Sequence, residues 1–220
     1  MCAEFKVGLL GAGMMGAEIA LSFAASGYPV IMKDMSLEIA NRGKARLDGI
    51  LDKAIRKGRC TAADKELALT RITPTDQYKE LGDASLVIEA IVEDFNAKKE
   101  VLTEVEAVCT PDCVIATNTS SIPITKLAAC LGPERRDKFA GAHFFSPAFV
   151  MQLVEIVPGL ETDEATVTFL MDLCRKIGKT PIRVKDVTGF VVNRILHAMW
   201  IEACRLLEEG VADPKDIDTG

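Results

Sequence analysis

The sequence predicts an α/β fold in which a doubly wound, mostly parallel sheet is followed by the start of an all-helical region. Short apolar runs alternate with helical segments, which is typical of β-α-β units in a parallel sheet. The motif GAGMMG directly follows the first apolar run and opens a helix, as the first unit of a Rossmann-type domain does. We expect this domain over residues 1–186 and the first part of a helical C-terminal domain over residues 187–220.

The expected elements follow from apolar spacing and from capping residues. Apolar runs with strand character lie at residues 5–10, 28–34, 71–73, 85–89, 113–117, 138–145, 152–157 and 180–186. Helical spacing is found at residues 11–26, 36–58, 96–109, 125–131, 163–177 and 188–210, and a short helix follows Thr61. Ser36 is expected to cap the second helix and Gly58 to end it, and Thr61 with Asp64 is a capping-type start.

Composition and charge exclude several classes of protein. Of the 220 residues, 49 % are hydrophobic, and the net charge is −6 without a dense basic block, so neither a nucleic acid nor an anionic membrane is an expected partner. No apolar run reaches about 18 residues, so no membrane span is expected, and strand character from Phe5 leaves no room for a signal or transit peptide. Seven cysteines without a C-x-x-C pair favour reduced thiols, a cytoplasmic location and no metal site.

The glycine motif and an aspartate after the second apolar run predict a dinucleotide site. Gly11 permits the tight turn, Gly13 lets a pyrophosphate approach the backbone, and Gly16 allows the helix to pack closely on the strand. Asp34 can accept hydrogen bonds from the adenosine ribose and would repel a 2′-phosphate, which favours NAD over NADP. A glycine turn without a ligand and a flavin site are the alternatives. The expected cofactor contacts are Gly11, Gly13, Met14, Met15, Gly16 and Asp34.

The stretch GAHFFSPAFVMQLVEIVP is almost wholly apolar, yet it contains His143 and Glu155. Alternation places Glu155 on one face of its strand, and the Ser146–Pro147 break can turn the chain so that two strands lie side by side. A carboxylate can fix the tautomer of an imidazole and stabilise its protonated form, as an acid–base pair requires. The alternative is a core histidine that a buried acid satisfies for structural reasons.

Six blocks of the sequence resemble, in order, those of the L-3-hydroxyacyl-CoA dehydrogenases, which include bacterial 3-hydroxybutyryl-CoA enzymes. The blocks are VGLLGAGMMGAEIA, VIEAIVED, TNTSSIPIT, FAGAHFFSPAFVMQLVEIVPG, GKTPIRVKDVTGFVVNRIL and DPKDIDTG. The resemblance covers essentially the whole chain. It implies an enzyme of fatty acid metabolism and β-oxidation that interconverts (S)-3-hydroxyacyl-CoA and 3-ketoacyl-CoA with NAD, and a homodimer formed through C-terminal helices.

The resemblance also assigns roles to individual residues. It makes His143 the catalytic base and Glu155 its partner, and it gives Ser120 and Asn193 the orientation of the substrate. Cofactor-side positions fall on Glu93, Lys98 and Ser120. The CoA phosphates fall near Lys53 and Lys57, and either lysine could be the one that binds them. Ser146 stands where stand-alone members often have Asn and multifunctional members often have Ser, so a polar contact with the substrate is expected there.

Two other functions remain open at this stage. One is a related dehydrogenase that acts on a small 3-hydroxy acid without CoA. The other is a non-catalytic dinucleotide-binding or structural protein, as relatives in eye lenses are, although a structural role need not retain Ser120, His143, Glu155 and Asn193. The second histidine, His197, lies inside the last long helical segment, and we expect it to be structural.

The helical segment at residues 188–210 has apolar residues on nearly every side, and only ten residues follow Gly210. Members of the family that the sequence resembles continue through several more helices, which cover this surface and form the dimer. We therefore expect this form to be a fragment or a short variant with an exposed apolar helix, a surface of the kind that drives association.

Overall fold

The computed structural model describes residues 5–220 and contains one eight-stranded sheet in the order β3-β2-β1-β4-β5-β6-β7-β8. Strands β1 to β6 are parallel, β7 is antiparallel to β6, and β8 is parallel to β7. The strands are β1 (Val7–Leu10), β2 (Val30–Lys33), β3 (Ile72–Thr75), β4 (Leu86–Glu89), β5 (Val114–Thr117), β6 (Phe139–Phe144), β7 (Leu153–Pro158) and β8 (Thr180–Arg183). The predicted doubly wound, mostly parallel sheet is confirmed.

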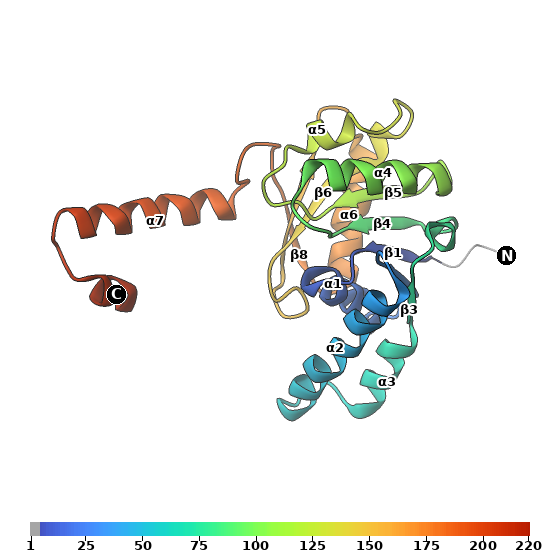
Figure 1. Cartoon of the computed structure of the whole chain (residues 1–220), viewed down its shortest axis with the longest axis horizontal. Coiled ribbons are helices and arrows are strands. Elements are labelled where there is room, and N and C mark those ends of the chain that lie inside the picture. Colours follow the sequence, from blue (N-terminus) through green and yellow to red (C-terminus); the bar gives the residue numbers. More distant parts are fainter. Residues whose placement is uncertain (1–4) are drawn as a thin grey trace.

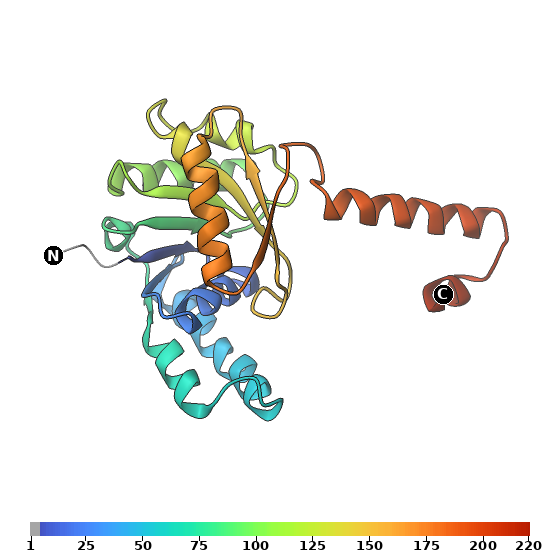
Figure 2. The same ribbon diagram turned by 180° about the vertical axis from the view of Figure 1, so that it is seen from behind.

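Helices cover both faces of this sheet (Figures 1 and 2). They are α1 (Met14–Ala25), α2 (Leu37–Arg56), α3 (Ala62–Thr70), α4 (Phe95–Val108), α5 (Ile124–Ala128), α6 (Glu164–Lys176), α7 (Val192–Glu208) and α8 (Pro214–Thr219), with short 3-10 turns η1 (Tyr78–Leu81) and η2 (Arg136–Lys138). One apolar core contains side chains of α1, α2, α3 and α6. A second core on the opposite face contains those of α4 and α5.

Alternation along the central strands decides which side chains meet which core. In β4, Leu86 and Ile88 belong to the core of α1 and α6, whereas Val87 belongs to the core of α4 and α5. Because side chains alternate between the faces, Glu89 at the end of β4 lies on the face of α4. The same period places Thr117 at the end of β5, and His143 near the end of β6, on that face.

Capping confirms several predicted helix ends. The Ser36 hydroxyl accepts a hydrogen bond from the Ile39 N–H, and Thr61 with Asp64 forms a capping box. Gly58 follows α2 with a φ of 65°, in the left-handed region that glycine adopts without strain.

The prediction of a helix over residues 188–210 is wrong at its start, because α7 begins only at Val192. Gly189 has a φ of 77° and Phe190 a φ of 49°, and neither value is compatible with a right-handed helix. The third strand runs from Ile72 to Thr75 rather than over residues 71–73, and it includes Pro74. A proline is tolerated there because β3 is an edge strand.

Helix α7 extends away from the sheet and leads to α8 (Figures 1 and 2). No residue of α7 is buried, and Trp200 is 55 % exposed. No helix within residues 5–220 is long and apolar enough to cross a membrane. The six cysteines in this part of the chain are free, and Cys2 lies outside it.

Candidate active site

The glycine loop between β1 and α1 has the close packing that its sequence predicts. Gly11 has a φ of 99°, and a Cβ there would lie 2.6 Å from the Ala90 oxygen. A Cβ on Gly16 would lie 1.9 Å from the Gly11 oxygen. A Cβ on Gly13 would meet no atom within 4 Å, so this backbone is open to an approaching ligand. The first turn of α1, which includes Met14 and Met15, presents N–H groups without intrahelical partners, and the loop therefore fits a pyrophosphate.

Asp34 directly follows β2 and is held against the glycine loop. Its Oδ2 accepts a hydrogen bond from the Ala12 N–H at 2.6 Å, and its Oδ1 accepts one from the Met35 N–H at 2.7 Å. Each carboxylate oxygen has two acceptor sites, so one site on each oxygen is left for ribose hydroxyls. The guanidinium of Arg46 also contacts this loop, through the Ala12 oxygen at 3.2 Å, a contact that no local pattern of the sequence indicates.

His143 and Glu155 lie opposite each other in the antiparallel pair β6–β7. His143 Nδ1 is 2.8 Å from Glu155 Oε2, and the two residues are 4 % and 0 % exposed. Glu155 Oε1 accepts hydrogen bonds from the N–H groups of Val191 and Val192, each at 3.0 Å. Burial alone would raise the pKa of Glu155, but the bonds from His143 and from these two N–H groups lower it below its ordinary value.

The other imidazole nitrogen faces a hydroxyl, and two aromatic rings contact the imidazole. Ser120 Oγ lies 3.1 Å from His143 Nε2. The Phe145 ring centroid is 4.5 Å from that of His143, and the Phe190 ring centroid is 5.5 Å away. Glu155, His143 and Ser120 thus form a hydrogen-bonded row bordered by apolar groups.

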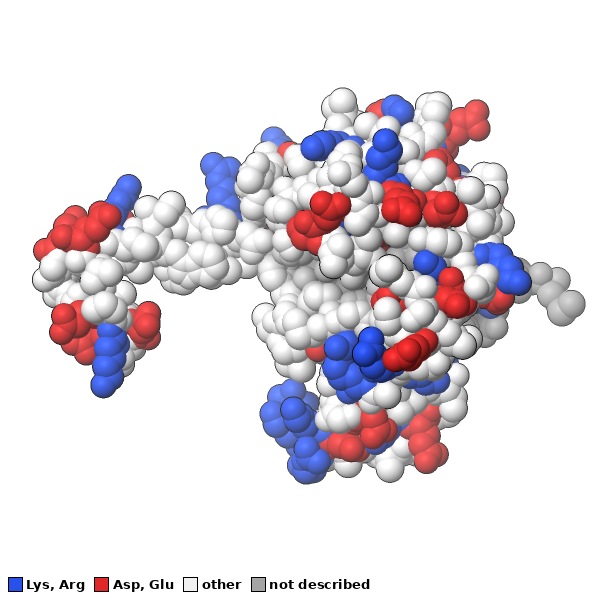
Figure 3. Space-filling model, viewed as in Figure 1, with Lys and Arg blue, Asp and Glu red and all other residues white. Residues whose placement is uncertain are grey.

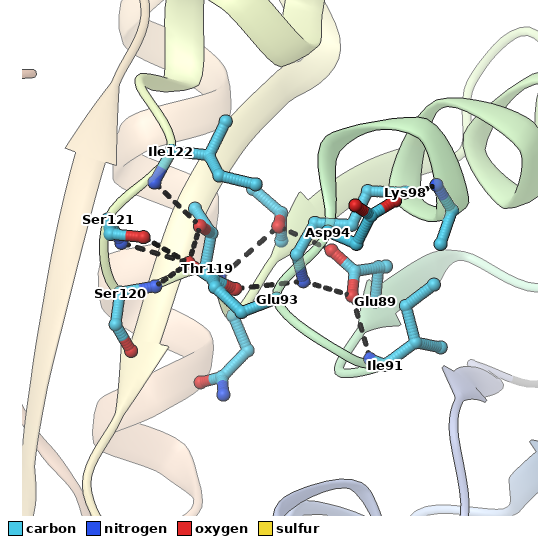
Figure 4. Close-up of polar contacts among 12 residues, drawn as sticks. Glu89, Ile91, Glu93, Asp94, Lys98, Thr119, Ser120, Ser121 and Ile122 are labelled. Carbon is cyan, nitrogen blue, oxygen red and sulfur yellow. Dashed lines mark hydrogen bonds and ion pairs between the residues drawn. The ribbon is translucent and has the colours of Figure 1, made fainter.

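The loop that carries Ser120 is bound to Glu93, which follows β4 (Figure 4). Glu93 Oε1 accepts hydrogen bonds from the N–H groups of Ser120 at 2.9 Å and of Ser121 at 3.0 Å, and also from the Thr119 hydroxyl. Burial would raise the pKa of Glu93, but the bond from Thr119, the charge of Lys98 and the other loop donors lower it to about 2. Glu93 is therefore a carboxylate at neutral pH.

Lys98 lies behind Glu93 rather than at the surface. It is 1 % exposed, and its Nζ is 2.6 Å from Glu89 Oε1 and 3.3 Å from Glu93 Oε2. Glu89 is fully buried, and the sequence analysis did not single it out. Its position at the end of the run LVIE was the available signal, since a charged residue closing a buried strand needs a partner.

Asn193 lies in the same region, at the start of α7. Its side-chain amide forms no hydrogen bond with any other residue among 5–220. Asn193 is the second residue of α7 and follows Val191 and Val192, the two residues whose N–H groups bind Glu155. His197 lies further along α7, exposed, with its ring centroid 5.4 Å from that of Trp200.

Lys53 and Lys57 line a groove of about 480 Å³ between α2 and the loop after β6. Phe149 and Val150 form the opposite wall, and the exposed Ser146 precedes it. Figure 3 shows lysine and arginine side chains gathered over the far end of α2. Glu18, which is 6 % exposed, also lines the groove and accepts a hydrogen bond from the Phe149 N–H at 3.3 Å; the sequence analysis missed it.

Residues 5–220 contain no cluster of three or more His, Cys, Asp or Glu side chains that could hold a metal. The candidate side chains lie together at the edge of the sheet formed by the carboxyl ends of β4, β5 and β6. Open α/β sheets bind their ligands at this edge.

Two family models match the chain. The model of the 3-hydroxyacyl-CoA dehydrogenase NAD binding domain matches residues 6–187, and that of the C-terminal domain matches residues 189–220. A probable 3-hydroxybutyryl-CoA dehydrogenase of Deinococcus radiodurans is 41 % identical over 97 % of this chain and 76 % of its own length. A 3-hydroxybutyryl-CoA dehydrogenase of Clostridioides difficile is 39 % identical over 97 % of this chain and 75 % of its own.

A solved structure and a longer relative are also similar to this chain. The crystal structure of (S)-3-hydroxybutyryl-CoA dehydrogenase PaaH1 from Ralstonia eutropha matches with a TM-score of 0.92 and 42 % identity, over 97 % of this chain and 75 % of that one. The fatty acid oxidation complex subunit alpha of Psychrobacter arcticus is 40 % identical over 97 % of this chain, which spans 29 % of that longer protein.

Proposed function

Since the chain belongs to the 3-hydroxyacyl-CoA dehydrogenase family and is an NAD-dependent oxidoreductase, we propose that it interconverts (S)-3-hydroxyacyl-CoA and 3-ketoacyl-CoA with His143 and Glu155 as its acid–base pair. The observation that carries the proposal is the hydrogen-bonded row of Glu155, His143 and Ser120 at the ligand-binding edge of the sheet. The names of the relatives in Deinococcus radiodurans and Clostridioides difficile support a short-chain substrate such as 3-hydroxybutyryl-CoA.

The oxidation of an alcohol to a ketone removes a hydride from carbon and a proton from oxygen. NAD, when bound, supplies the acceptor for the hydride. His143 would accept the proton on Nε2, because Nδ1 is hydrogen-bonded to Glu155. A neutral imidazole with its hydrogen on Nδ1 has a free electron pair on Nε2 and can take the hydroxyl proton near neutral pH.

Glu155 makes this proton transfer favourable. Burial of His143 disfavours a charged imidazolium, and the carboxylate beside it compensates for that cost. Burial would raise the pKa of Glu155, but its hydrogen bonds from His143 and from the Val191 and Val192 N–H groups lower it. Glu155 therefore stays ionised in this role. The Phe145 and Phe190 rings exclude water from the neighbourhood of the imidazole.

The remaining candidate residues would bind NAD and the acyl-CoA substrate. Gly11, Gly13 and Gly16 with the first turn of α1 would hold the pyrophosphate of NAD, and Asp34 would hold its adenosine ribose. Glu93 and Lys98 would support the cofactor side of the site. Ser120, Asn193 and Ser146 would orient the substrate, and Lys53 and Lys57 would bind the CoA phosphates. A second copy of the chain would associate through α7, and the free cysteines within residues 5–220 support a cytoplasmic setting.

The test is an assay of the unmodified chain with NADH and acetoacetyl-CoA, beside NADH binding measured alone. His143→Gln is expected to keep NADH binding and to lower turnover by about 10²–10⁴-fold, the usual contribution of one acid–base group. His197→Gln is the matched control and should retain full turnover. Binding of NADH without any turnover would favour a non-catalytic protein, and turnover of acetoacetate rather than its CoA thioester would favour a dehydrogenase of small 3-hydroxy acids.

A further inference from the structure

Glu89 is a buried carboxylate that the proposed mechanism does not use. It is 0 % exposed and ends β4. Its Oε1 accepts hydrogen bonds from Lys98 Nζ at 2.6 Å and from the Ile91 N–H at 2.7 Å, and its Oε2 accepts one from the Thr117 hydroxyl at 2.6 Å. All of these partners are internal, so Glu89 has no surface with which to contact a cofactor or substrate.

Two chains of contacts lead from Glu89 to the loop that carries Ser120, and Figure 4 labels the residues of the first. The first passes through Lys98, whose ammonium also reaches Glu93 Oε2 at 3.3 Å, and then through Glu93 to the Ser120 N–H at 2.9 Å. The second passes through Thr117, whose hydroxyl oxygen accepts a hydrogen bond from the Thr119 N–H at 3.3 Å while its hydrogen is donated to Glu89.

The sheet register explains why this buried group can act on the histidine. Glu89 is paired with Thr117 across β4 and β5, and Thr117 with Gly141 across β5 and β6. His143 is therefore two residues further along β6, on the same face of the sheet. The Ser120 loop lies above this row and reaches His143 Nε2 through its hydroxyl at 3.1 Å.

We propose that Glu89 is a positioning residue: together with Lys98 and Thr117, it sets the place of Ser120 Oγ relative to His143 Nε2. The inference rests on the proposed function, because it assigns Glu89 a part in that reaction. The electrostatic reason is that one ammonium lies between two carboxylates. Without the charge of Glu89, Lys98 has only Glu93 to balance it, and the two would draw closer and move the loop bound to Glu93. A displacement of about 1 Å at a reacting centre can cost about 10²-fold in rate.

A kinetic cycle tests this proposal. Glu89→Gln is expected to lower kcat by up to about 10²-fold, whereas the Kd for NADH should change far less, because Glu89 itself contacts no ligand. In a Ser120→Ala background the same substitution should cause no further loss, because its effect is exerted through Ser120. Glu106→Gln is the matched control, since Glu106 also accepts a backbone hydrogen bond, from the Gly132 N–H at 2.8 Å; its kcat should not change. Additive losses in the double variant, or a weaker NADH affinity with unchanged kcat, would overturn the proposal.

A spectroscopic measurement separates this inference from the proposed function. The chain has two histidines, so ¹⁵N-histidine spectra resolve His143 with His197 as an internal reference. Glu89→Gln should shift the Nε2 resonance of His143. In a Ser120→Ala background, Glu89→Gln should leave that resonance unshifted. An unmodified chain without turnover would refute the proposed function and leave this measurement intact, whereas an unmoved Nε2 resonance would refute the role of Glu89. If Glu89→Gln does not fold, Thr117→Val removes one of the two links and should shift the same resonance.

Discussion

Glu93 remains charged because the loop opposite it donates hydrogen bonds to its carboxylate. Burial opposes the charge, but the Thr119 and Ser120 donors and the ammonium of Lys98 lower the pKa of Glu93 to about 2. A carboxylate with a lower pKa in the folded than in the unfolded chain stabilises the fold above its unfolded pKa, and that contribution is lost as the pH falls through its folded pKa. Glu93 therefore contributes stability near neutral pH that disappears between about 4.5 and about 2.

The first prediction concerns the stability that Glu93 contributes near neutral pH and loses at low pH. Glu93→Gln is expected to lower the Tm near neutral pH, and the gap in Tm to the unmodified chain should narrow as the pH is lowered towards 2. Glu134→Gln, which changes an exposed carboxylate without a hydrogen bond among the described residues, should show no such narrowing. A constant gap for Glu93→Gln would mean that its bonds to the 119–121 loop contribute little to stability.

The second prediction concerns cofactor choice. Asp34 is fixed by the N–H groups of Ala12 and Met35, so its charge cannot turn away from a 2′-phosphate. The unmodified chain should have a much higher kcat/KM with NADH than with NADPH, and Asp34→Ser should weaken NADH binding and reduce that difference. Equal kcat/KM for both cofactors in the unmodified chain would contradict the role of Asp34.

Sequence patterns could predict many of these residues but not the groups that support them. The glycine loop and the His143–Glu155 pair were identified because their spacing or chemistry is unusual. The partners of Glu89, Glu18 and Arg46 could not be predicted because they come from other elements: Glu89 meets Thr117 of β5, and Glu18 meets the backbone at Phe149. A local pattern can indicate that a buried charge needs a partner, as at the end of the run LVIE, but it does not indicate which distant residue is that partner.

Helices and strands were predictable where local rules decide their ends. Ser36 and the Thr61–Asp64 box mark helix starts by their own hydrogen bonds. Apolar spacing alone places the start of α7 too early, because it continues through Phe190, where the backbone is left-handed. The alternation of β6 and β7 indicated that His143 and Glu155 could become neighbours, and their register pairs them directly.

The third prediction tests the groove beside α2. If Lys53 and Lys57 bind the phosphates of CoA, replacing both by Gln should raise the KM for acetoacetyl-CoA and make it less sensitive to salt. The KM for an acetoacetyl pantetheine thioester, which lacks those phosphates, should change little. Lys65→Gln offers a control on neighbouring α3, since that lysine pairs with Asp48 and Asp52. Equal losses with both substrates would point to a change in folding instead.

The molecule as a whole has an apolar arm, which Figure 3 shows as the largely uncharged length of α7. Ile195, Met199, Trp200 and Ile201 are all more than half exposed, at 64 %, 58 %, 55 % and 54 %. An exposed apolar surface of this kind drives association. The apolar spacing together with the family resemblance predicts this exposure, whereas neither indicates the direction in which the arm leaves the sheet.

The fourth prediction is that the chain self-associates through this arm. Sedimentation at micromolar concentration should show a dimer or a larger species, and Trp200→Asp should shift it towards monomer. Trp200→Asp should still fold, because the Trp200 side chain is 55 % exposed and its ring contact is with the exposed His197. Glu202→Gln on the same helix is the control and should leave association unaffected. A monomeric unmodified chain would contradict the prediction.

The two oxygens of Glu155 have a consequence for how the arm and the histidine communicate. Oε2 binds the imidazole, and Oε1 binds the N–H groups at the start of α7. One carboxylate therefore belongs to two equilibria: proton uptake by His143 and attachment of the arm. Thermodynamic linkage requires these to be reciprocal. A ligand or neighbour that draws the start of α7 away would remove two of the hydrogen bonds that lower the pKa of Glu155, and a change in the charge of Glu155 would in turn change how firmly α7 is held.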